Sequence, residues 1–317
     1  MDELNITPIF IMGAYRSGTT MLASHLASSE HAIALPEMPF VLDIIESNAK
    51  TDEELSSLYN QLTQQFHYQA SGMSITFDEF AQPFKSNAPR AERVFHILRL
   101  HFGLSQGDKR FWIEHTPHNR ERVEKYLAVF PNAKFIHIVR DPRAVYASMH
   151  NLIRWNSQDP VAFAKKWQRA ITYSHLACCS QPDITFELNY EEYVTEQATI
   201  LPKLCRFIGI PYTREMNAGN GIKLPQYTLK QHQLVGQAPD ATRIHAWQQS
   251  IDKREAEIIQ SECQPWMKHY GMTLLLADPK PITLKETLRY KLKQRLYTPL
   301  SKLKRLKDKL ITSHTPQ

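Results

Sequence analysis

The sequence predicts an α/β protein in which a central, mostly parallel sheet lies between layers of helices. Three segments carry this prediction: residues 9–22, 134–148 and 183–207 each run from a short apolar stretch, through a turn, into a helical pattern. Apolar stretches that alternate with helices are typical of parallel sheets, because the crossover between two parallel strands usually contains a helix. We therefore expect three layers, with helices on both faces of one sheet.

Length and composition fit one large soluble domain with a terminal extension. The 317 residues are 42% hydrophobic and 22% charged, as in ordinary globular proteins. We expect an α/β domain over residues 1–278, with a helical cap inserted at about 40–105, and a basic, amphipathic helical extension over 279–317. The sequence has no run of about 18 apolar residues and its first residues lack the basic segment of a signal peptide, which predicts a cytoplasmic protein.

The first predicted strand and helix flank a turn that begins and ends in glycine, at Gly13 and Gly18. Glycine permits the conformations that turn backbone N–H groups inward, and these groups hold an anion together with the positive end of the following helix. The spacing is that of a nucleoside-triphosphate loop, but Thr19 replaces the lysine of that pattern and the positive charge lies at Arg16. This loop suits a shorter anionic chain that needs no metal; the alternative is a turn without a ligand.

A second short strand over residues 32–35 ends in the turn Pro36-Glu37-Met38-Pro39. Open parallel sheets bind their ligands beyond the carboxyl ends of the strands, which is where this turn lies. Glu37 is therefore a candidate acidic group of a site, the alternative being a solvated turn residue. The next segment, up to about residue 105, has apolar residues at helical spacing and predicts the cap.

Two further strands end in candidate site residues. The strand over 110–114 is followed by His115, and the strand over 134–140 ends in Arg140. A serine, Ser148, lies two turns into the next helix. An arginine supplies a planar fork of donors and a serine a hydroxyl, so Arg140 and Ser148 can face one anion.

The last predicted strand, 183–188, leads into a helix that Tyr190 opens. Residues 211–242 are irregular in pattern, with few apolar side chains. Because a loop of this length is uncommon unless it closes over a site, we expect it to cover a ligand. Arg243 and a helix over 252–270 follow.

Two of these segments resemble the sulfotransferases that use 3′-phosphoadenosine 5′-phosphosulfate (PAPS), in particular the branch of the tyrosylprotein sulfotransferases and their bacterial relatives. The loop of that family for the 5′-phosphosulfate reads roughly G-x-x-R-S-G-T-T-x-L, and Gly13 to Leu22 match it throughout. The family motif for the 3′-phosphate, R-D-P-R-x-x-x-x-S, matches Arg140 to Ser148. The resemblance implies a P-loop-type three-layer sandwich and in-line transfer of a sulfuryl group from PAPS to a hydroxyl acceptor, with no metal.

The resemblance also implies roles for single residues. Arg140 and Ser148 select the 3′-phosphate, and Glu37 is the general base that takes the proton of the acceptor hydroxyl. Tyr190 either lines the nucleotide or is structural, and Arg243 is a candidate contact of a nucleotide phosphate. The residues that hold the 5′ end are Gly13, Arg16, Ser17, Gly18, Thr19 and Thr20, and Arg16 also stabilises charge on the leaving phosphate.

His115 departs from the family pattern. The corresponding segment of the family often reads K-T-P, with the lysine at the bond that breaks, whereas this sequence reads His115-Thr116-Pro117. A protonated imidazole offsets negative charge as lysine does, which predicts activity that depends on pH between about 6 and 8. In the alternative, His115 only hydrogen-bonds nearby backbone.

Two other functions fit parts of the pattern. One is a P-loop phosphotransferase that uses ATP and Mg²⁺, against which the missing loop lysine argues. The other is a non-catalytic nucleotide-binding protein. The four cysteines show no metal-ligand spacing, so we predict no metal site. The acceptor stays open among a peptide tyrosine, a glycan, a lipid and a small metabolite.

The C-terminal extension contains most of the positive charge. Residues 279–317 hold eleven basic and two acidic side chains, a net charge of +9, which leaves −3 for the rest of the chain. Nothing outside this segment suggests nucleic-acid binding. Leucines recur every fourth residue from Leu284 to Leu296, and a break is expected at Pro299. The extension is a peripheral membrane anchor, a stripe that packs against a second subunit, or a solvated basic tail.

Overall fold

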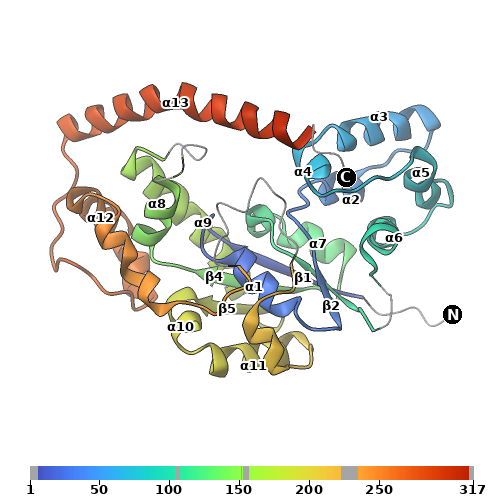
Figure 1. The fold of residues 1–317 in the computed structure, drawn as a ribbon, viewed down its shortest axis with the longest axis horizontal. Helices are drawn as coiled ribbons and strands as arrows, with labels where there is room; N and C mark the ends of the chain where they lie inside the picture. The colour runs from blue at the N-terminus through green and yellow to red at the C-terminus, as the bar shows by residue number, and fades with distance from the viewer. Residues whose placement is uncertain (1–5, 105–107, 151, 153–156, 223–234, 314–317) are drawn as a thin grey trace.

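Parallel strands form the central sheet of the computed structural model, which describes residues 6–104, 108–150, 152, 157–222 and 235–313 (Figure 1). The described strands are β1 (Thr7–Gly13), β2 (Ala32–Ala34), β3 (Phe111–Glu114), β4 (Lys134–Val139) and β5 (Thr185–Asn189).

The strand order is β2-β3-β1-β4-β5, and every neighbouring pair is parallel. The prediction of a mostly parallel sheet between helices is confirmed. Strand β1 lies in the centre, where Phe10 pairs with Glu114 of β3 and with Phe135 of β4. The chain reverses its direction of winding between these neighbours. The ends of β1, β3 and β4 therefore enclose the crevice in which such sheets bind ligands.

Alternate residues of β1 pack into two different cores. Ile9 and Ile11 pack with helices α1, α10 and α11, whereas Phe10 and Met12 face α7 and the cap. All four side chains are fully buried, as expected for a strand with a helical layer on each face. Helix α9 also packs on β1, β4 and β5, and α8 and α12 pack against α9. These helices are α1 (Thr19–Leu26), α7 (Val123–Val129), α8 (Pro142–His150), α9 (Pro160–Ser180), α10 (Tyr190–Thr195), α11 (Gln197–Ile208) and α12 (Lys253–His269).

The segment between β2 and β3 is helical, and its helices gather at one side of the sheet (Figure 1). Thr51 and Thr76 each begin a helix with a capping box, in which the threonine and a glutamate three residues later satisfy free backbone N–H groups. The buried side chains of this segment continue the core around Trp112 and Phe130. These helices are α2 (Val41–Glu46), α3 (Asp52–Thr63), α4 (Phe66–Ala70), α5 (Phe77–Lys85) and α6 (Arg90–Phe102).

The C-terminal segment forms one long helix, α13 (Leu284–Ser313), that continues through Pro299. The break expected at this proline was wrong. Proline removes one backbone hydrogen bond, but Pro299 and Arg295, whose carbonyl loses that bond, are both exposed to solvent. Water can therefore replace the lost donor. No helix among the described residues is both long enough and apolar enough to cross a membrane.

The irregular segment that precedes Arg243 is described only in part. Its first portion packs on α1, where the backbone N–H of Gly221 donates to the carbonyl of Ser24 at 3.2 Å. The expectation that residues 211–242 close over a ligand stays a prediction, because residues 223–234 of this segment lie outside the described residues. The 3₁₀ helices of the described chain include η1 (Pro117–Glu121), η3 (Pro182–Ile184), η4 (Arg214–Ala218) and η6 (Ala241–Gln249).

Candidate active site

The loop between β1 and α1 has a backbone that two glycines make possible. Gly13 has φ +154° and Gly18 has φ +96°, both in the region that side chains disfavour. A Cβ on Gly13 would lie 2.6 Å from the carbonyl oxygen of Ile138, and one on Gly18 would lie 2.8 Å from the ring of Tyr190. Arg16 also has a positive φ, +66°, which is uncommon for a side chain of this size and marks a strained loop.

Polar groups at the start of α1 lie buried with few partners. Ser17, Thr19 and Thr20 are all buried, and Gly18 begins the helix without a side-chain cap. The hydroxyl of Ser17 has no hydrogen-bond partner among the described residues. Unpaired N–H groups at a helix start, together with a buried hydroxyl that lacks a partner, form a cradle for an anionic group.

Arg16 and Arg140 approach each other although 124 residues separate them. Nη1 of Arg140 donates to the backbone oxygen of Arg16 at 3.0 Å, and Nε of Arg16 donates to Oγ of Ser148 at 3.0 Å. The guanidinium of Arg140 lies 4.2 Å from the ring centroid of Tyr190. The structure therefore brings together the loop arginine, both residues of the second motif and Tyr190.

The electrostatics of this arginine pair favour an anion. Burial, and next the positive charge of Arg140, lower the pKa of Arg16 to about 10, so that its guanidinium stays charged at neutral pH. Nε of Arg140 is buried and has no hydrogen-bond partner among the described residues. Two neighbouring guanidinium groups, one of which has an N–H donor without a partner among the described residues, are stabilised when a phosphate or sulfate group lies between them.

Glu37 lies close to this positive centre. The negative charge of Glu37 partly opposes the lowering of the pKa of Arg16. It is also the second cause, after burial, of the rise in the pKa of Tyr15 to about 12. The hydroxyl of Tyr15 lies 2.6 Å from Nε2 of His118. The turn that contains Glu37, predicted to carry a carboxylate of the site, thus faces the loop that follows β1.

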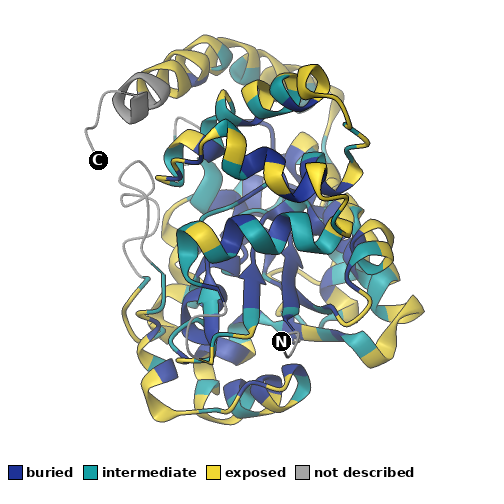
Figure 2. Ribbon diagram, turned by 90° about the vertical axis from the view of Figure 1, so that its right-hand side faces the viewer, coloured by how far each residue is buried: buried dark blue, intermediate teal, exposed yellow. Residues whose placement is uncertain are grey.

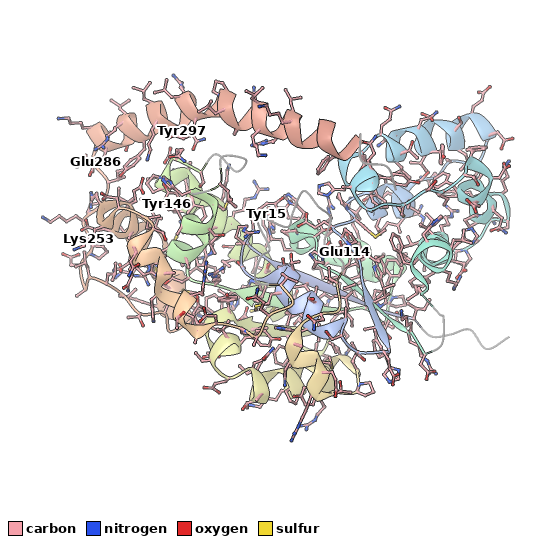
Figure 3. All side chains as sticks on the ribbon, viewed as in Figure 1. Tyr15, Glu114, Tyr146, Lys253, Glu286 and Tyr297 are labelled. Carbon is pink, nitrogen blue, oxygen red and sulfur yellow. The ribbon has the colours of Figure 1, made fainter. Side chains whose placement is uncertain are left out.

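Glu114 holds that turn in place, and the sequence analysis missed it. This carboxylate is only 2% exposed. It accepts hydrogen bonds from the backbone N–H of Met38 at 3.2 Å, from the N–H of Thr116 at 3.1 Å and from Nδ2 of Asn119 at 2.5 Å. The hydroxyl of Thr116 also donates to it. Glu114 therefore ties the end of β3 to the residue that follows Glu37. Figure 3 shows Glu114 and Tyr15 in the central part of the molecule.

The signal for Glu114 was present in the sequence. It is the one charged residue in the strand segment Phe-Trp-Ile-Glu, where an apolar residue would continue the pattern. A second missed residue is Arg120, which is buried and donates from Nη1 to the carbonyl of Gly13 at 3.1 Å. Its position in a turn after β3 gave no signal, because only the tertiary fold brings that turn to the loop.

His115 is buried, and its surroundings disfavour the protonated imidazole. Burial lowers the pKa of the imidazole, and the nearby charge of Glu114 opposes this shift only in part. The backbone of Leu35 also lies near the ring, but neither ring nitrogen makes a well-formed hydrogen bond among the described residues. A lowered pKa disfavours the protonated imidazole. The pH dependence between about 6 and 8 that was expected from a protonated His115 stays a prediction.

Arg243 does not join the group. It lies exposed on η6, and the described residues give its side chain no contact with the loop. Trp247, on the same 3₁₀ helix, is buried. The guanidinium of Arg143 lies 4.3 Å from the centroid of the Trp247 ring. Nη2 of Arg143 in turn donates to Oδ2 of Asp141 at 2.7 Å. These contacts fix the start of α8. Trp247, Arg143 and Asp141 therefore stabilise the fold.

Comparison with known proteins agrees with this site. The family model described as the sulfotransferase family matches residues 8–214, which include the loop and the Arg140 motif. The chain belongs to the sulfotransferase family. The membership expected from the two motifs is confirmed.

The relatives differ in the acceptor that their names give. The chain is 28% identical over 173 residues to omega-hydroxy-beta-dihydromenaquinone-9 sulfotransferase Stf3 of Mycobacterium tuberculosis, a match that covers 46% of this chain and 45% of the relative. It is 34% identical over 92 residues to protein-tyrosine sulfotransferase 1 of Danio rerio, covering 27% and 26%. The chain thus spans less than half the length of these curated relatives.

A solved structure supports the fold. The sulfotransferase domain of the olefin synthase of Synechococcus PCC 7002 superposes with a TM-score of 0.63 at 20% identity, covering 86% of this chain and 98% of that domain. At this identity the likeness shows the shared fold alone. The P-loop-type sandwich expected from the sequence is confirmed.

Gly18→Ala should destabilise the loop more than an alanine at a comparable glycine in open space. Gly72 has φ +74°, and a Cβ added to it would have no atom within 4 Å, so Gly72→Ala carries only the backbone cost of about 1 kcal/mol. Gly18→Ala adds a clash with Tyr190. We expect a larger loss of the free energy of unfolding in urea for Gly18→Ala. Equal losses for the two variants would contradict the close approach.

Glu114→Ala should lower the free energy of unfolding by about 3 kcal/mol, because several buried donors lose their acceptor. The matched control is Glu92→Ala. Glu92 pairs with Arg99 near the surface, with 41% of its side chain exposed, so we expect a loss of less than about 1 kcal/mol. Urea unfolding of both variants measures the difference. A loss for Glu114→Ala no larger than that of the control would show that the network is not structural.

Proposed function

We propose that this protein transfers a sulfuryl group from PAPS to a hydroxyl acceptor. The observation that supports this most is the contact of Arg140 and Ser148 with Arg16, because it combines two anion-binding motifs in one place. A donor with one anionic group at its 5′ end and another at its 3′ position needs two such groups of donors close together. A nucleoside triphosphate without a 3′-phosphate would not use the second group.

The loop binds the 5′ end of the donor. The N–H groups at the start of α1 and the hydroxyl of Ser17 lack a full set of partners, and the guanidinium of Arg16 adds positive charge beside them. The side chains of Thr19 and Thr20 lie buried next to these groups. Together they stabilise the negative charge that develops on the leaving phosphate. Because the position of the loop lysine holds Thr19, the site lacks the group that triphosphate-binding loops direct to the β- and γ-phosphates.

Arg140 and Ser148 bind the 3′-phosphate, and Tyr190 supports them. The ring of Tyr190 lies under the guanidinium of Arg140 and against Gly18, so it fixes the distance between the two anion-binding groups. This contact gives Tyr190 a positioning role toward the donor. Arg243, which lies exposed on η6, is left out of the proposed nucleotide site.

Glu37 acts as the general base. The acceptor oxygen attacks sulfur, and its proton passes to the carboxylate of Glu37. A new S–O bond forms to the acceptor as the S–O bond to the 5′-phosphate breaks, leaving the sulfated product and adenosine 3′,5′-bisphosphate. Arg16 interacts electrostatically with Glu37, which places a positive charge beside the proposed base.

His115 takes part as a neutral hydrogen-bond donor. Both ring nitrogens are buried without a well-formed hydrogen bond among the described residues, so one N–H is available to the oxygen that bridges sulfur and the 5′-phosphate. A neutral imidazole stabilises that oxygen without supplying a full charge. This differs from the charged lysine that family relatives often carry there.

The acceptor is a hydroxyl compound. The names of two relatives specify a protein tyrosine and a hydroxylated menaquinone, and both acceptors present a hydroxyl to the donor. The proposed chemistry with Glu37 requires that group and no particular scaffold around it.

Adenosine 3′,5′-bisphosphate should stabilise the protein against heat, and Arg140→Ala should remove most of the effect. At about 100 times its dissociation constant a ligand adds roughly 2.7 kcal/mol, which moves the unfolding midpoint by several degrees. Arg206→Ala, at an exposed arginine of α11, is the control and should retain the shift. A shift with ATP and Mg²⁺ but none with the bisphosphate would overturn the proposal in favour of phosphoryl transfer.

Glu37→Gln should lower kcat by about 10²- to 10⁴-fold while the affinity for adenosine 3′,5′-bisphosphate stays the same or rises slightly. Affinity does not fall, because the substitution removes a negative charge near Arg16. Glu30→Gln, at an exposed glutamate, is the matched control and should change neither quantity. Turnover is followed with PAPS and a panel of hydroxyl acceptors. A parallel loss of bisphosphate affinity in Glu37→Gln would show that the residue is structural.

A further inference from the structure

Helix α13 presents a row of leucines to solvent. Seven leucines along the helix are each at least half exposed, and Leu284 reaches 86%. Figure 2 shows α13 as a mostly exposed helix along the top of the molecule. Single exposed leucines are normal on a protein surface, but seven on one helix are more than an isolated soluble domain usually leaves uncovered. The exposed leucines are Leu284, Leu288, Leu292, Leu296, Leu300, Leu303 and Leu306.

The opposite side of α13 is fixed to the body of the protein by mainly polar contacts. Nε of Arg254 donates to Oε1 of Glu286 at 2.8 Å, and Oε1 of Gln294 accepts from the backbone N–H of Gln158 at 2.9 Å. Tyr290 and Ser301 are buried on the same side. These contacts hold the helix in one orientation, in which the seven leucines stay at least half exposed.

Positive charge accompanies the leucines. Eight exposed lysines and arginines lie on α13 between its start and residue 307. Their long apolar stems can lie along a membrane surface while the charged ends reach lipid headgroups. Each basic side chain near an anionic membrane adds to the attraction. These residues are Lys285, Arg289, Lys291, Arg295, Lys302, Lys304, Arg305 and Lys307.

We propose that α13 docks this protein on an anionic lipid membrane, with its leucines at the acyl boundary and its basic residues at the headgroups. The helix has several features of an interfacial segment: exposed leucines, many basic side chains and low overall hydropathy. Its 30 residues correspond to about 45 Å of helix that lies along the surface. None of these features needs the chain to cross the bilayer.

A second copy of the chain fits this face less well than a membrane does. Two copies of α13 would bring together two segments that each carry most of a net charge of +9. The acidic residues that pair helices through complementary charges are nearly absent, since residues 279–317 contain only Glu286 and Asp308. Leucines at steps of four from Leu284 to Leu300 also drift around the helix, instead of keeping the narrow seam of a coiled coil.

Docking through α13 orients the catalytic body. The helix begins beside α12 and extends to α4 of the cap, so it spans one side of the molecule (Figure 1). Figure 3 shows Tyr15 between these two ends and beneath the helix. A membrane bound to α13 would therefore lie on the side of the protein that carries this helix. This is the side on which the helix passes over Tyr15.

Vesicle flotation of the full-length protein tests the proposal. We expect binding to phosphatidylcholine vesicles that contain about 30% phosphatidylglycerol, weak binding to phosphatidylcholine alone, and release at about 0.5 M salt. The triple variant Leu288→Gln, Leu292→Gln, Leu296→Gln should bind the anionic vesicles at least about tenfold more weakly. Leu176→Gln is the matched control, because Leu176 is 59% exposed but lies on α9, and it should bind as the wild type does.

Two further measurements separate docking from other causes. Circular dichroism and the unfolding midpoint should be the same in the triple variant and the wild type, because the substituted leucines are exposed and glutamine is a good helix former. Light scattering should show the same oligomeric state for both proteins. The proposal is overturned if the wild type does not bind anionic vesicles, if the triple variant binds them equally well, or if the triple variant dissociates a dimer that the wild type forms.

Discussion

The approach of Arg16 to Arg140 is the constraint on which the rest of the candidate site depends. Two guanidinium groups in a partly buried place repel each other, and the structure holds them there by a contact from Arg140 to the backbone of Arg16 and by the ring of Tyr190. Gly18 must lack a side chain because that ring occupies the space. The arrangement brings two positive charges close together, an unfavourable interaction that a bound anion would relieve.

The sheet order explains why these groups meet. Strand β1 lies between β3 and β4, so the segments that leave the three strands diverge around one crevice. The loop after β1 gives Arg16, the end of β4 gives Arg140, and the end of β3 gives Glu114 and His115. Glu114 then fixes the turn that carries Glu37 through the backbone of Met38. A single topological feature thus determines both the anion site and the position of the proposed base.

Sequence reasoning identified what local patterns encode. The glycine loop, the Arg140 motif and the alternation of strands and helices are local signals, and they predicted the fold. The contact of Arg16 with Ser148 was not predicted, because it joins two motifs that only the tertiary fold brings together. The burial of His115, which lowers the pKa of its imidazole, could not be predicted, because segments distant in the chain cause it. Glu114 was missed because its role lies in contacts to Met38 and Asn119. The usual effect of proline predicted a break in α13. The helix continues, because Pro299 lies at an exposed position where water can replace the lost hydrogen bond.

Net charge and site charge are separate properties in this protein. The sequence pI of about 9.0 arises from the C-terminal extension, since the remainder of the chain carries −3. The body nevertheless builds a positive centre, because Arg16, Arg120 and Arg140 converge on the loop. These buried and partly buried guanidinium groups act over a few ångströms and are little screened, whereas the exposed charges of α13 act over a broad surface and are screened by salt. An anionic nucleotide and an anionic surface would therefore be attracted by different parts of the chain.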